Sequence, residues 1–443
     1  MGRLFGTDGI RGVAGKELTS ELAKGVGTAL VAVLDRVGAR VLIGMDTRES
    51  SEALASAVAE GISGMGADAV IIGVCSTPAV AYLVKKNKFD AGVMISASHN
   101  PYQYNGIKIF GGDGFKLSDA LEDRIEGVIA KNPSGMGGGT VSRDENMRRE
   151  YLEFLKGSFG ISLSGLRVGI DCANGSASVT AEELFTSLGA DCTMTATTPD
   201  GVNINENCGS THLGNLKEIV AREGLDLGIA FDGDADRCLA IDSEGREVDG
   251  DFIMAILSLS LREKGKLHHD TVVGTVMSNL GFVKFCEENG LNFIATKVGD
   301  RYVLEKMNEC GYAFGGEQSG HLILSELATT GDGQLTAVAL LSRIKESGKS
   351  LSALASVMKK YPQYMVNIHA DQDGKAAFAS SNEVKELIAK AEERLSGIGR
   401  LVIRPSGTEP LVRIMAEGED LGMITELCNS LAKDISEILK TSV

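Results

Sequence analysis

The stretch Ala91-Gly92-Val93-Met94-Ile95-Ser96-Ala97-Ser98-His99-Asn100-Pro101 joins a short apolar run to a polar turn. The run 91–95 has the length and composition of a buried strand, and two serines, a histidine and an asparagine follow within five residues. In α/β folds, ligands bind beyond the carboxyl ends of such strands. The stretch therefore predicts an α/β fold in which a polar loop presents Ser98 as an exposed hydroxyl.

The residues before this stretch alternate between two patterns. Apolar residues recur at helical spacing over 18–37 and 50–65, whereas 40–46 and 69–74 are short apolar runs that are typical of strands. Alternation of helices and strands in this order indicates βαβ units. It predicts a largely parallel sheet covered by helices.

The same layout is expected twice more, each time before a polar loop. We predict strands and helices at 166–171, 180–188, 227–231, 272–276 and 293–297. No repeat is visible in the letters themselves, so only the layout is predicted to be duplicated. The sequence pattern changes after Tyr361-Pro362. Strand-like runs at 364–369, 401–404 and 411–415 and helix-like runs at 383–395 and from 423 onwards indicate a small α+β domain.

The fold class predicted from these patterns is α/β, with three related α/β domains of mixed, largely parallel sheets and a smaller α+β C-terminal domain. A length of 443 residues favours about three domains, with two to four all reasonable. A glycine-rich connector at 132–139, followed by a helix at 143–155, sets the first boundary. The predicted domains are 1–155, 156–251, 252–363 and 364–443.

The composition excludes several classes of protein. A formal charge of −16 argues against a general nucleic-acid or anionic-membrane surface, so any phosphate site is expected to be local. No apolar run approaches the ~20 residues of a membrane span, and the first residues contain no apolar signal core. Eight scattered cysteines without zinc-ligand spacing indicate free thiols in a reducing compartment. We expect a soluble cytoplasmic protein with no nucleic-acid or membrane partner.

Three aspartates follow the predicted strand 227–231 at alternate positions, as Asp232, Asp234 and Asp236, and Arg237 closes the cluster. Three carboxylates can converge on one cation if Gly233 and Ala235 let the chain turn tightly, and hard oxygen ligands suit Mg²⁺. A solvated acidic turn is the alternative. The position directly after an apolar strand favours the metal site.

Two other loops carry polar side chains of a specific kind. The segment Arg404-Pro405-Ser406-Gly407-Thr408 offers a guanidinium, two hydroxyls and backbone N–H groups, which predicts a phosphate site with Arg413 as a second donor. If the segment 315–321 is extended, Glu317 and Ser319 lie on one side and suit sugar hydroxyls, although an ordinary glycine-rich turn fits the pattern about as well. Additional candidates are Arg11, Lys108, Lys297, Arg301 and His321.

A serine hydroxyl is a weak nucleophile unless a base, a metal or a positive charge activates it. The aspartate cluster with its expected metal supplies the activation that Ser98 needs. Together with the phosphate-binding loop, it predicts phosphoryl transfer on a sugar.

Four motifs in order resemble the α-D-phosphohexomutase superfamily, and the resemblance covers the whole chain. The motifs are Phe5-Gly6-Thr7-Asp8-Gly9-Ile10-Arg11-Gly12, Asn203-Ile204-Asn205-Glu206-Asn207-Cys208-Gly209-Ser210-Thr211-His212, Gly316-Glu317-Gln318-Ser319-Gly320-His321 and Arg404-Pro405-Ser406-Gly407-Thr408-Glu409-Pro410. The resemblance implies four domains around a central cleft. One departure is Tyr104, where an acidic residue is expected in many members.

The resemblance also implies a role for each candidate residue. Ser98 carries the phosphoryl group, and a phosphate oxygen on it completes a Mg²⁺ site made by the three aspartates. The reacting end is lined by Arg11, His99, Lys108 and Lys297. The sugar and the phosphate that is not reacting are bound by Arg237, Glu317, Ser319, His321, Arg404, Ser406, Gly407, Thr408 and Arg413.

The activity implied is the interconversion of glucosamine 6-phosphate and glucosamine 1-phosphate through a 1,6-bisphosphate, with glucosamine or glucose 1,6-bisphosphate as activator. The product would feed UDP-N-acetylglucosamine and cell-wall precursor synthesis. Two alternatives stay open: a mutase for glucose or mannose phosphates, and a non-catalytic regulator that binds a sugar phosphate. A homodimer is compatible with the resemblance.

Overall fold

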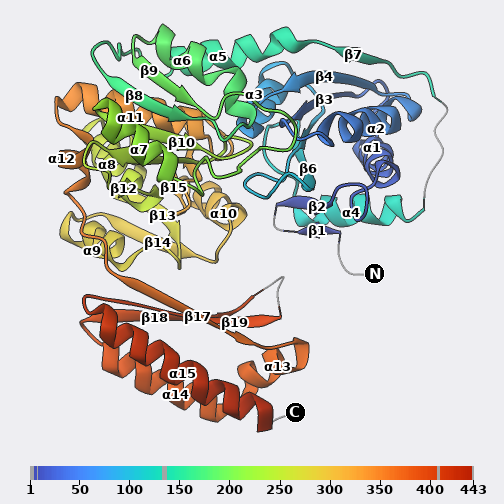
Figure 1. The fold of residues 1–443 in the computed structure, drawn as a ribbon. Helices are drawn as coiled ribbons and strands as arrows, with labels where there is room; N and C mark the ends of the chain where they lie inside the picture. Colours follow the sequence, from blue (N-terminus) through green and yellow to red (C-terminus); the bar gives the residue numbers. More distant parts are fainter. Residues whose placement is uncertain (1–3, 7, 132–136, 407–409, 442–443) are drawn as a thin grey trace. The chain divides into compact units, whose positions relative to one another are not determined.

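The computed structural model describes residues 4–6, 8–131, 137–406 and 410–441 (Figure 1). The chain divides into two compact units. The first comprises Met1–Thr275 and Thr296–Val357, and the second comprises Val276–Ala295 and Met358–Val443. Part of the predicted connector, residues 132–136, lies outside the described residues.

The first sheet has seven strands in the order β1-β2-β6-β5-β3-β4-β7. The strand β3 pairs in parallel with β4 and β5, whereas β6 pairs antiparallel with both β5 and β2. The strands are β1 (Phe5–Gly6), β2 (Gly9–Val13), β3 (Arg40–Met45), β4 (Asp68–Val74), β5 (Ala91–Ile95), β6 (Tyr104–Gly111) and β7 (Val141–Arg143). The helices of this part are α1 (Ser20–Leu34), α2 (Ser51–Gly64), α3 (Thr77–Lys86) and α4 (Asp119–Ile129).

The second sheet has the strand order β12-β11-β10-β8-β9. Its elements are α5 (Arg148–Gly157), β8 (Arg167–Asp171), α6 (Ala181–Ser187), β9 (Asp191–Thr195), α7 (Gly214–Glu223), β10 (Leu227–Phe231), β11 (Cys238–Asp242) and β12 (Glu247–Val248). The third sheet contains β13 (Thr271–Thr275), β15 (Phe314–Gly316) and β16 (Leu322–Leu324), with the helices α8 (Gly250–Glu263), α10 (Asp300–Cys310), α11 (Gly333–Ser347) and α12 (Leu351–Ala355).

The three sheets share one arrangement of strands. In the orders β6-β5-β3, β11-β10-β8 and β16-β15-β13, the middle strand pairs in parallel with the third strand and antiparallel with the first. The layout predicted from the sequence is thus repeated. Each polar loop joins the middle strand to an antiparallel return strand, so it is a hairpin connection and not the strand-to-helix connection of a simple βαβ unit.

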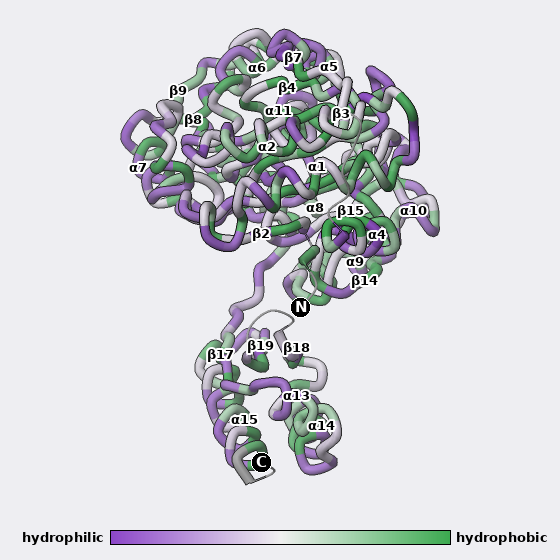
Figure 2. The backbone as a smooth tube through the Cα atoms, turned by 90° about the vertical axis from the view of Figure 1, so that its right-hand side faces the viewer, coloured by the Kyte–Doolittle hydropathy of each residue, from purple (hydrophilic) through white to green (hydrophobic). Residues whose placement is uncertain are grey.

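The second unit contains an antiparallel sheet in the order β17-β19-β18. Ile424, Leu427, Leu431 and Ile435 of α15 are buried at helical spacing, and Figure 2 shows hydrophilic and hydrophobic residues along this helix. The elements are α9 (Leu280–Glu288), most of β14 (Asn292–Thr296), β17 (Gln363–His369), α13 (Gln372–Ser380), α14 (Asn382–Leu395), β18 (Gly399–Pro405), β19 (Leu411–Gly418) and α15 (Leu421–Thr441). This matches the predicted α+β pattern.

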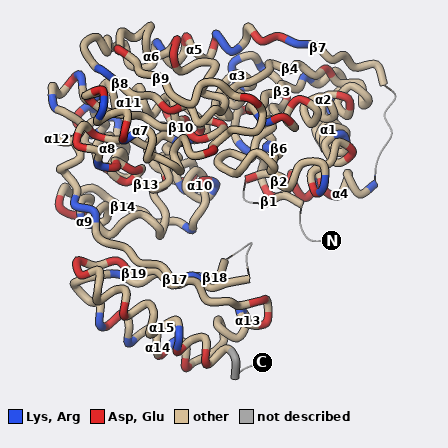
Figure 3. The backbone as a smooth tube through the Cα atoms, in the orientation of Figure 1, with Lys and Arg blue, Asp and Glu red and all other residues tan. Residues whose placement is uncertain are grey.

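Charged residues of both signs are distributed along the chain. Figure 3 shows acidic and basic residues interspersed along the described part of the tube. Among the described residues, no helix is long and apolar enough to cross a membrane.

The helices α1 and α2 approach each other so closely that glycine is required where they cross. A Cβ atom on Gly61 would lie 2.1 Å from the backbone oxygen of Lys24, and one on Gly27 would lie 2.2 Å from that of Val58. Both neighbours are backbone atoms, so neither can move aside without shifting a helix.

We expect Gly61→Ala to lower the stability of the chain by about 1–3 kcal/mol, because the added methyl overpacks the crossing. Gly64→Ala is the matched control in the same helix, since a Cβ there would meet no atom within 4 Å. The control should be neutral or stabilising by up to about 1 kcal/mol through helix propensity. Urea unfolding followed by circular dichroism measures both, and equal midpoints for the two variants would contradict the close crossing.

Candidate active site

The loops after β5 and β10 meet at Ser98. Its Oγ donates a hydrogen bond to Oδ2 of Asp232 at 2.6 Å, although the two residues are 134 positions apart. The expectation of an exposed serine is wrong, because Ser98 is only 1% exposed. The loop that carries the three aspartates covers it: a Cβ on Gly233 would lie 2.5 Å from the carbonyl oxygen of Ser98.

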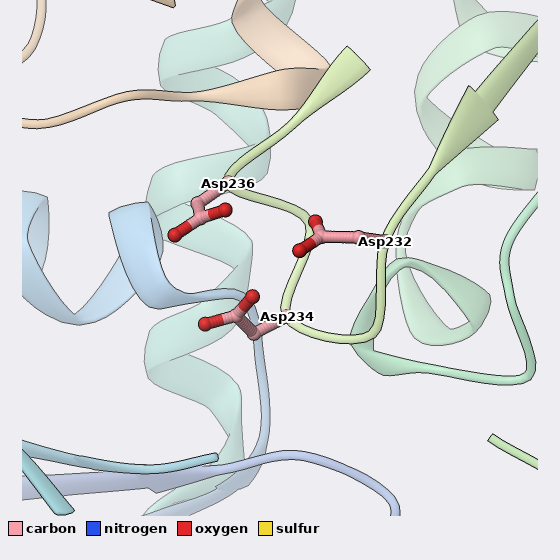
Figure 4. Close-up of side chains that lie close together, drawn as sticks. All are labelled: Asp232, Asp234 and Asp236. Atoms are coloured by element: carbon pink, nitrogen blue, oxygen red, sulfur yellow. The ribbon is translucent and has the colours of Figure 1, made fainter. Parts of the chain in front are cut away.

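The three aspartates converge as the sequence predicts (Figure 4). Each of Asp232, Asp234 and Asp236 is buried and offers a carboxylate oxygen, and these oxygens lie within 4.8 Å of one another. The turn is made possible by Ala235, whose φ of 55° is left-handed. The return strand β11 then carries the chain away, so all three carboxylates stay on one short loop.

Burial and mutual repulsion set the electrostatics of this cluster. Burial, together with the charges of Asp236 and Asp234, raises the pKa of Asp232. Burial acts the same way on Asp236, but Lys108 and His321 outweigh it and hold the pKa of Asp236 below its ordinary value. The cluster is therefore a concentration of negative charge that needs cations.

Lys108 supplies one such cation from β6. Its side chain is 1% exposed, and Nζ lies 2.8 Å from Oδ2 of Asp234, 3.4 Å from Oδ2 of Asp236 and 3.0 Å from Oδ2 of Asp8. Burial disfavours the charged amine, but the three carboxylates raise the pKa of Lys108 well above its ordinary value. Lys108 is therefore a fixed positive charge at the centre of the site.

The aspartates fit a divalent cation. Oδ1 of Asp234 and Oδ1 of Asp236 are buried and accept no hydrogen bond from the part of the chain that the structure describes. Buried carboxylate oxygens without donors are costly unless a cation meets them. Three hard oxygens at this spacing are the donor set that Mg²⁺ prefers.

His99 lies beside the hydroxyl of Ser98, with Nδ1 3.2 Å from Oγ. Burial and the nearby Arg237 and Arg11 lower the pKa of His99 to about 4. The imidazole is therefore neutral at pH 7 and has a lone pair for a proton or a hydrogen bond.

Two arginines stand at the edge of the cluster. Nε of Arg237 lies 3.9 Å from Oδ1 of Asp236, and the backbone N–H of Arg237 donates to Oδ1 of Asp232 at 3.2 Å. Arg11 forms an ion pair with Asp8 from the strand β2. The side chains of Arg237 and Arg11 are 21% and 26% exposed, so both are only partly buried.

The loop after β15 is a turn, which is one of the two alternatives that its sequence left open. The N–H of Gly320 donates to the carbonyl oxygen of Glu317 at 2.9 Å, so residues 317–320 form a turn. The carboxylate of Glu317 accepts a hydrogen bond from the N–H of Gly299 at 3.1 Å, and burial raises the pKa of Glu317. Glu317 and Ser319 are both half-buried.

His321 is nearly fully buried beside the loop of the three aspartates. Its Nε2 accepts a hydrogen bond from the N–H of Gly331 at 3.0 Å, which assigns the proton to Nδ1. Nδ1 lies 3.5 Å from Oδ2 of Asp236. These contacts hold the imidazole of His321 beside Asp236.

Lys297 and Arg301, the two basic candidates near residue 300, have different surroundings in the structure. Lys297 is exposed, with its Nζ 5.9 Å from the ring centroid of Tyr302. Arg301 instead donates to the carboxylate of Glu122 at 2.6 Å and to the carbonyl oxygen of Leu117, and so ties α10 to α4. Arg301 is therefore structural.

Sequence reasoning did not single out the acidic partners of the basic residues. Lys116 has its Nζ 2.6 Å from Oδ1 of Asp8 and 2.5 Å from Oδ2 of Asp300. Thr77 donates a hydrogen bond to Asp234 from the start of α3. Asp8 and Asp300 stood beside named basic residues in glycine-rich turns, but pairs so distant in sequence leave no local pattern.

The second unit carries the candidate phosphate loop. Arg404 of β18 and Arg413 of β19 are direct cross-strand partners, and burial together with Arg413 lowers the pKa of Arg404. Ser406 is buried, and its carbonyl oxygen accepts a hydrogen bond from Nζ of Lys375 at 2.5 Å. Gly407 and Thr408 lie outside the described residues.

Four family models match nearly the whole chain. They are the phosphoglucomutase/phosphomannomutase α/β/α domains I, II and III at residues 2–136, 149–245 and 249–361, and the C-terminal domain of that family at residues 365–434. Among solved structures, a phosphoglucomutase/phosphomannomutase family protein from Burkholderia thailandensis shares the fold, with a TM-score of 0.83, 22% identity, and coverage of 99% of this chain and 98% of that one.

Curated relatives are similar over their full length. The phosphoglucosamine mutase of Clostridium acetobutylicum is 50% identical over 445 residues and covers 99% of both chains. That of Caldicellulosiruptor saccharolyticus is also 50% identical, over 99% of this chain and 100% of the relative. The chain therefore belongs to the phosphoglucomutase/phosphomannomutase family and, within that family, to the phosphoglucosamine mutases.

Proposed function

We propose that this enzyme interconverts glucosamine 6-phosphate and glucosamine 1-phosphate by way of a phosphoserine at residue 98. The observation that carries the proposal is the 2.6 Å contact between the hydroxyl of Ser98 and a buried group of three aspartates. A hydroxyl beside a cation site suits phosphoryl transfer, in which charge on the transferring oxygens must be neutralised.

The reaction consists of two transfers. The phosphoryl group passes from Oγ of Ser98 to the 1-hydroxyl of glucosamine 6-phosphate, and the proton of that hydroxyl ends on Oγ. The 1,6-bisphosphate then turns round, and its 6-phosphoryl group returns to Ser98, leaving glucosamine 1-phosphate. Each transfer breaks one P–O bond and forms another. Neutral His99, 3.2 Å from Oγ, is positioned to pass the proton.

Asp232, Asp234 and Asp236 would hold Mg²⁺, which would supply charge neutralisation at the transferring phosphoryl group. Lys108 keeps two of these carboxylates in place, and Arg11 and Arg237 add positive charge at the edge of the site. Glucosamine or glucose 1,6-bisphosphate would load Ser98 by the second half of the same reaction. No further co-reactant is needed for that step.

The non-reacting phosphate would bind at Arg404 and Arg413. Arg404 and Arg413 lie directly opposite each other on neighbouring strands, and a phosphate would be attracted to two guanidinium groups placed in this way. Glu317 and Ser319 would bind sugar hydroxyls, and Lys297 would contact substrate. The functions then divide over the four predicted domains as phosphoserine (1–155), metal (156–251), sugar (252–363) and phosphate (364–443). A cytoplasmic location fits the free thiols.

Glucosamine 6-phosphate should exceed glucose 6-phosphate and mannose 6-phosphate in kcat/KM by roughly tenfold or more. A site built for an amine leaves a buried acceptor unpaired when a hydroxyl replaces it, which costs about 1–3 kcal/mol. Steady-state kinetics with the three sugars at equal bisphosphate concentration measure the ratio. Equal values would assign the chain a broader hexose phosphate specificity and reject the proposed substrate.

Ser98→Ala should reduce turnover at least about a thousandfold, since removal of a covalent nucleophile is among the costliest changes in an active site. Intact mass after incubation with glucose 1,6-bisphosphate should show one added phosphate on the parent protein and none on the variant. Ser56→Ala, on the exposed side of α2, is the control and should behave like the parent. A phosphorylated, active Ser98→Ala protein would place the phosphoryl carrier elsewhere.

Chelation should stop turnover and added Mg²⁺ should restore it. Asp234→Asn should also weaken Mg²⁺ binding by calorimetry, because one formal charge leaves a site of hard oxygens. Asp191→Asn, at the exposed start of β9, removes the same charge outside the cluster and should leave Mg²⁺ affinity unchanged. If both variants bind Mg²⁺ like the parent, the three aspartates are not the metal site.

A further inference from the structure

Arg48 is a buried arginine that lies just after β3, in the segment Asp46-Thr47-Arg48. The side chains of Arg48 and Asp46 are both 0% exposed, and Nε of Arg48 donates to Oδ2 of Asp46 at 2.8 Å. Removal of a guanidinium group from water is costly unless every N–H finds an acceptor. The acceptors of its other N–H groups therefore show which segment the buried guanidinium holds in place.

The other four N–H groups of Arg48 all point at one loop. Nη1 lies 2.5 Å from the carbonyl oxygen of Pro101 and 3.0 Å from that of Tyr104. Nη2 lies 2.8 Å from the carbonyl oxygen of Asn100 and 2.9 Å from that of Ser98. A guanidinium has five N–H donors, so all five are used, and four of them hold the backbone of the hairpin loop that carries Ser98.

The backbone of Ser98 needs such support. Its φ of 53° is left-handed, a conformation that is unfavourable for a residue other than glycine. Nδ2 of Asn205 donates to the carbonyl oxygen of Ser98 at 3.0 Å and to that of Asn100 at 3.2 Å. The N–H of Ser98 donates to Oγ of Ser96 at 2.9 Å.

The hydrogen bonds of Arg48 and Ser98 meet at the carboxylate of Asp46. Oγ of Ser96 donates to Oδ2 of Asp46 at 2.7 Å, and Oγ of Ser51 donates to Oδ1 at 2.7 Å. Both ends of the Ser98 residue, its N–H and its carbonyl, are thus connected to the one carboxylate through short chains of hydrogen bonds. Such a frame fixes the direction of the Ser98 side chain, which points at Asp232.

We propose that Arg48 is a positioning residue that, with Asp46 and Asn205, holds Ser98 in the backbone conformation required for phosphoryl transfer. The inference rests on the proposed function of Ser98. Lysine cannot replace the arginine, because an ammonium group has three donors and lacks the planar fork that reaches four carbonyl oxygens. Arg48 does not touch the sugar in this scheme, so it acts on the chemical step and not on substrate affinity.

Arg48→Lys should lower kcat roughly a hundredfold, the loss expected when reacting atoms are misplaced by about 1 Å, while KM for glucosamine 6-phosphate changes less than about threefold. The rate at which glucose 1,6-bisphosphate phosphorylates Ser98, followed by intact mass, should fall in parallel. In Arg48→Ala, added guanidinium ion should recover part of kcat, and it should not speed the parent enzyme.

Arg148→Lys is the matched control, since Nη1 of Arg148 donates to the carbonyl oxygen of Val74, outside the Ser98 loop. Its kcat should stay within about twofold of the parent. Asn205→Asp keeps the side-chain shape but removes the hydrogen-bond donor to the Ser98 carbonyl. It tests whether these hydrogen bonds position Ser98 even if the Arg48 variants do not fold. It should lower kcat at least about tenfold at unchanged KM.

The inference is overturned if a folded Arg48→Lys or Asn205→Asp enzyme keeps the kcat and the Ser98 phosphorylation rate of the parent. It is also overturned if KM rises while kcat stays constant, because that pattern belongs to substrate binding. Failure of the proposed function looks different: Ser98→Ala would then remain active. A loss of stability alone, with the rate of Ser98 phosphorylation intact, would show that Arg48 only supports folding.

Discussion

Three carboxylates buried on one short loop are the constraint on which the rest of the site depends. Asp232, Asp234 and Asp236 repel one another, and burial removes the water that would screen them. Lys108 is buried for this reason, since its ammonium group meets two of the three. Oδ1 of Asp234 and Oδ1 of Asp236 accept no hydrogen bond from the described residues, so the cluster fits a second, divalent cation beside the hydroxyl of Ser98.

The shared strand arrangement explains how loops so far apart in sequence reach one place. In each sheet the polar loop leaves a central strand and returns antiparallel beside it, so its residues cannot drift away from the sheet edge. The return strand can also contribute a side chain to the site. Lys108 lies in β6, which follows the Ser98 loop, and its ammonium group pairs with Asp234 and Asp236.

The sequence predicted β5 and β10, the strands that lead into the Ser98 loop and the aspartate loop, but neither β15 nor the return strands β6, β11 and β16. Uniform apolar runs such as 91–95 and 227–231 are recognisable without partners. β6 was missed because Lys108 and two glycines interrupt its apolar pattern, and a buried lysine makes sense only once the aspartates 126 and 128 residues away are in contact with it. The convergence of the three aspartates was predictable from residue type and position. The burial of Ser98 was not, since it depends on Gly233 of another loop.

Left-handed residues gather where the loops touch. Ser98, Ala235 and Asn205 all have φ between 53° and 60°, and none of them is glycine. Such conformations persist only when surrounding bonds over-determine them. Arg48 and Asn205 hold the Ser98 carbonyl, and the N–H of Gly333 holds the carbonyl oxygen of Ala235 at 3.0 Å. The strain is local and the hydrogen bonds that offset it come from distant segments, so the conformation of Ser98 is a property of the assembled loops and not of the serine segment alone.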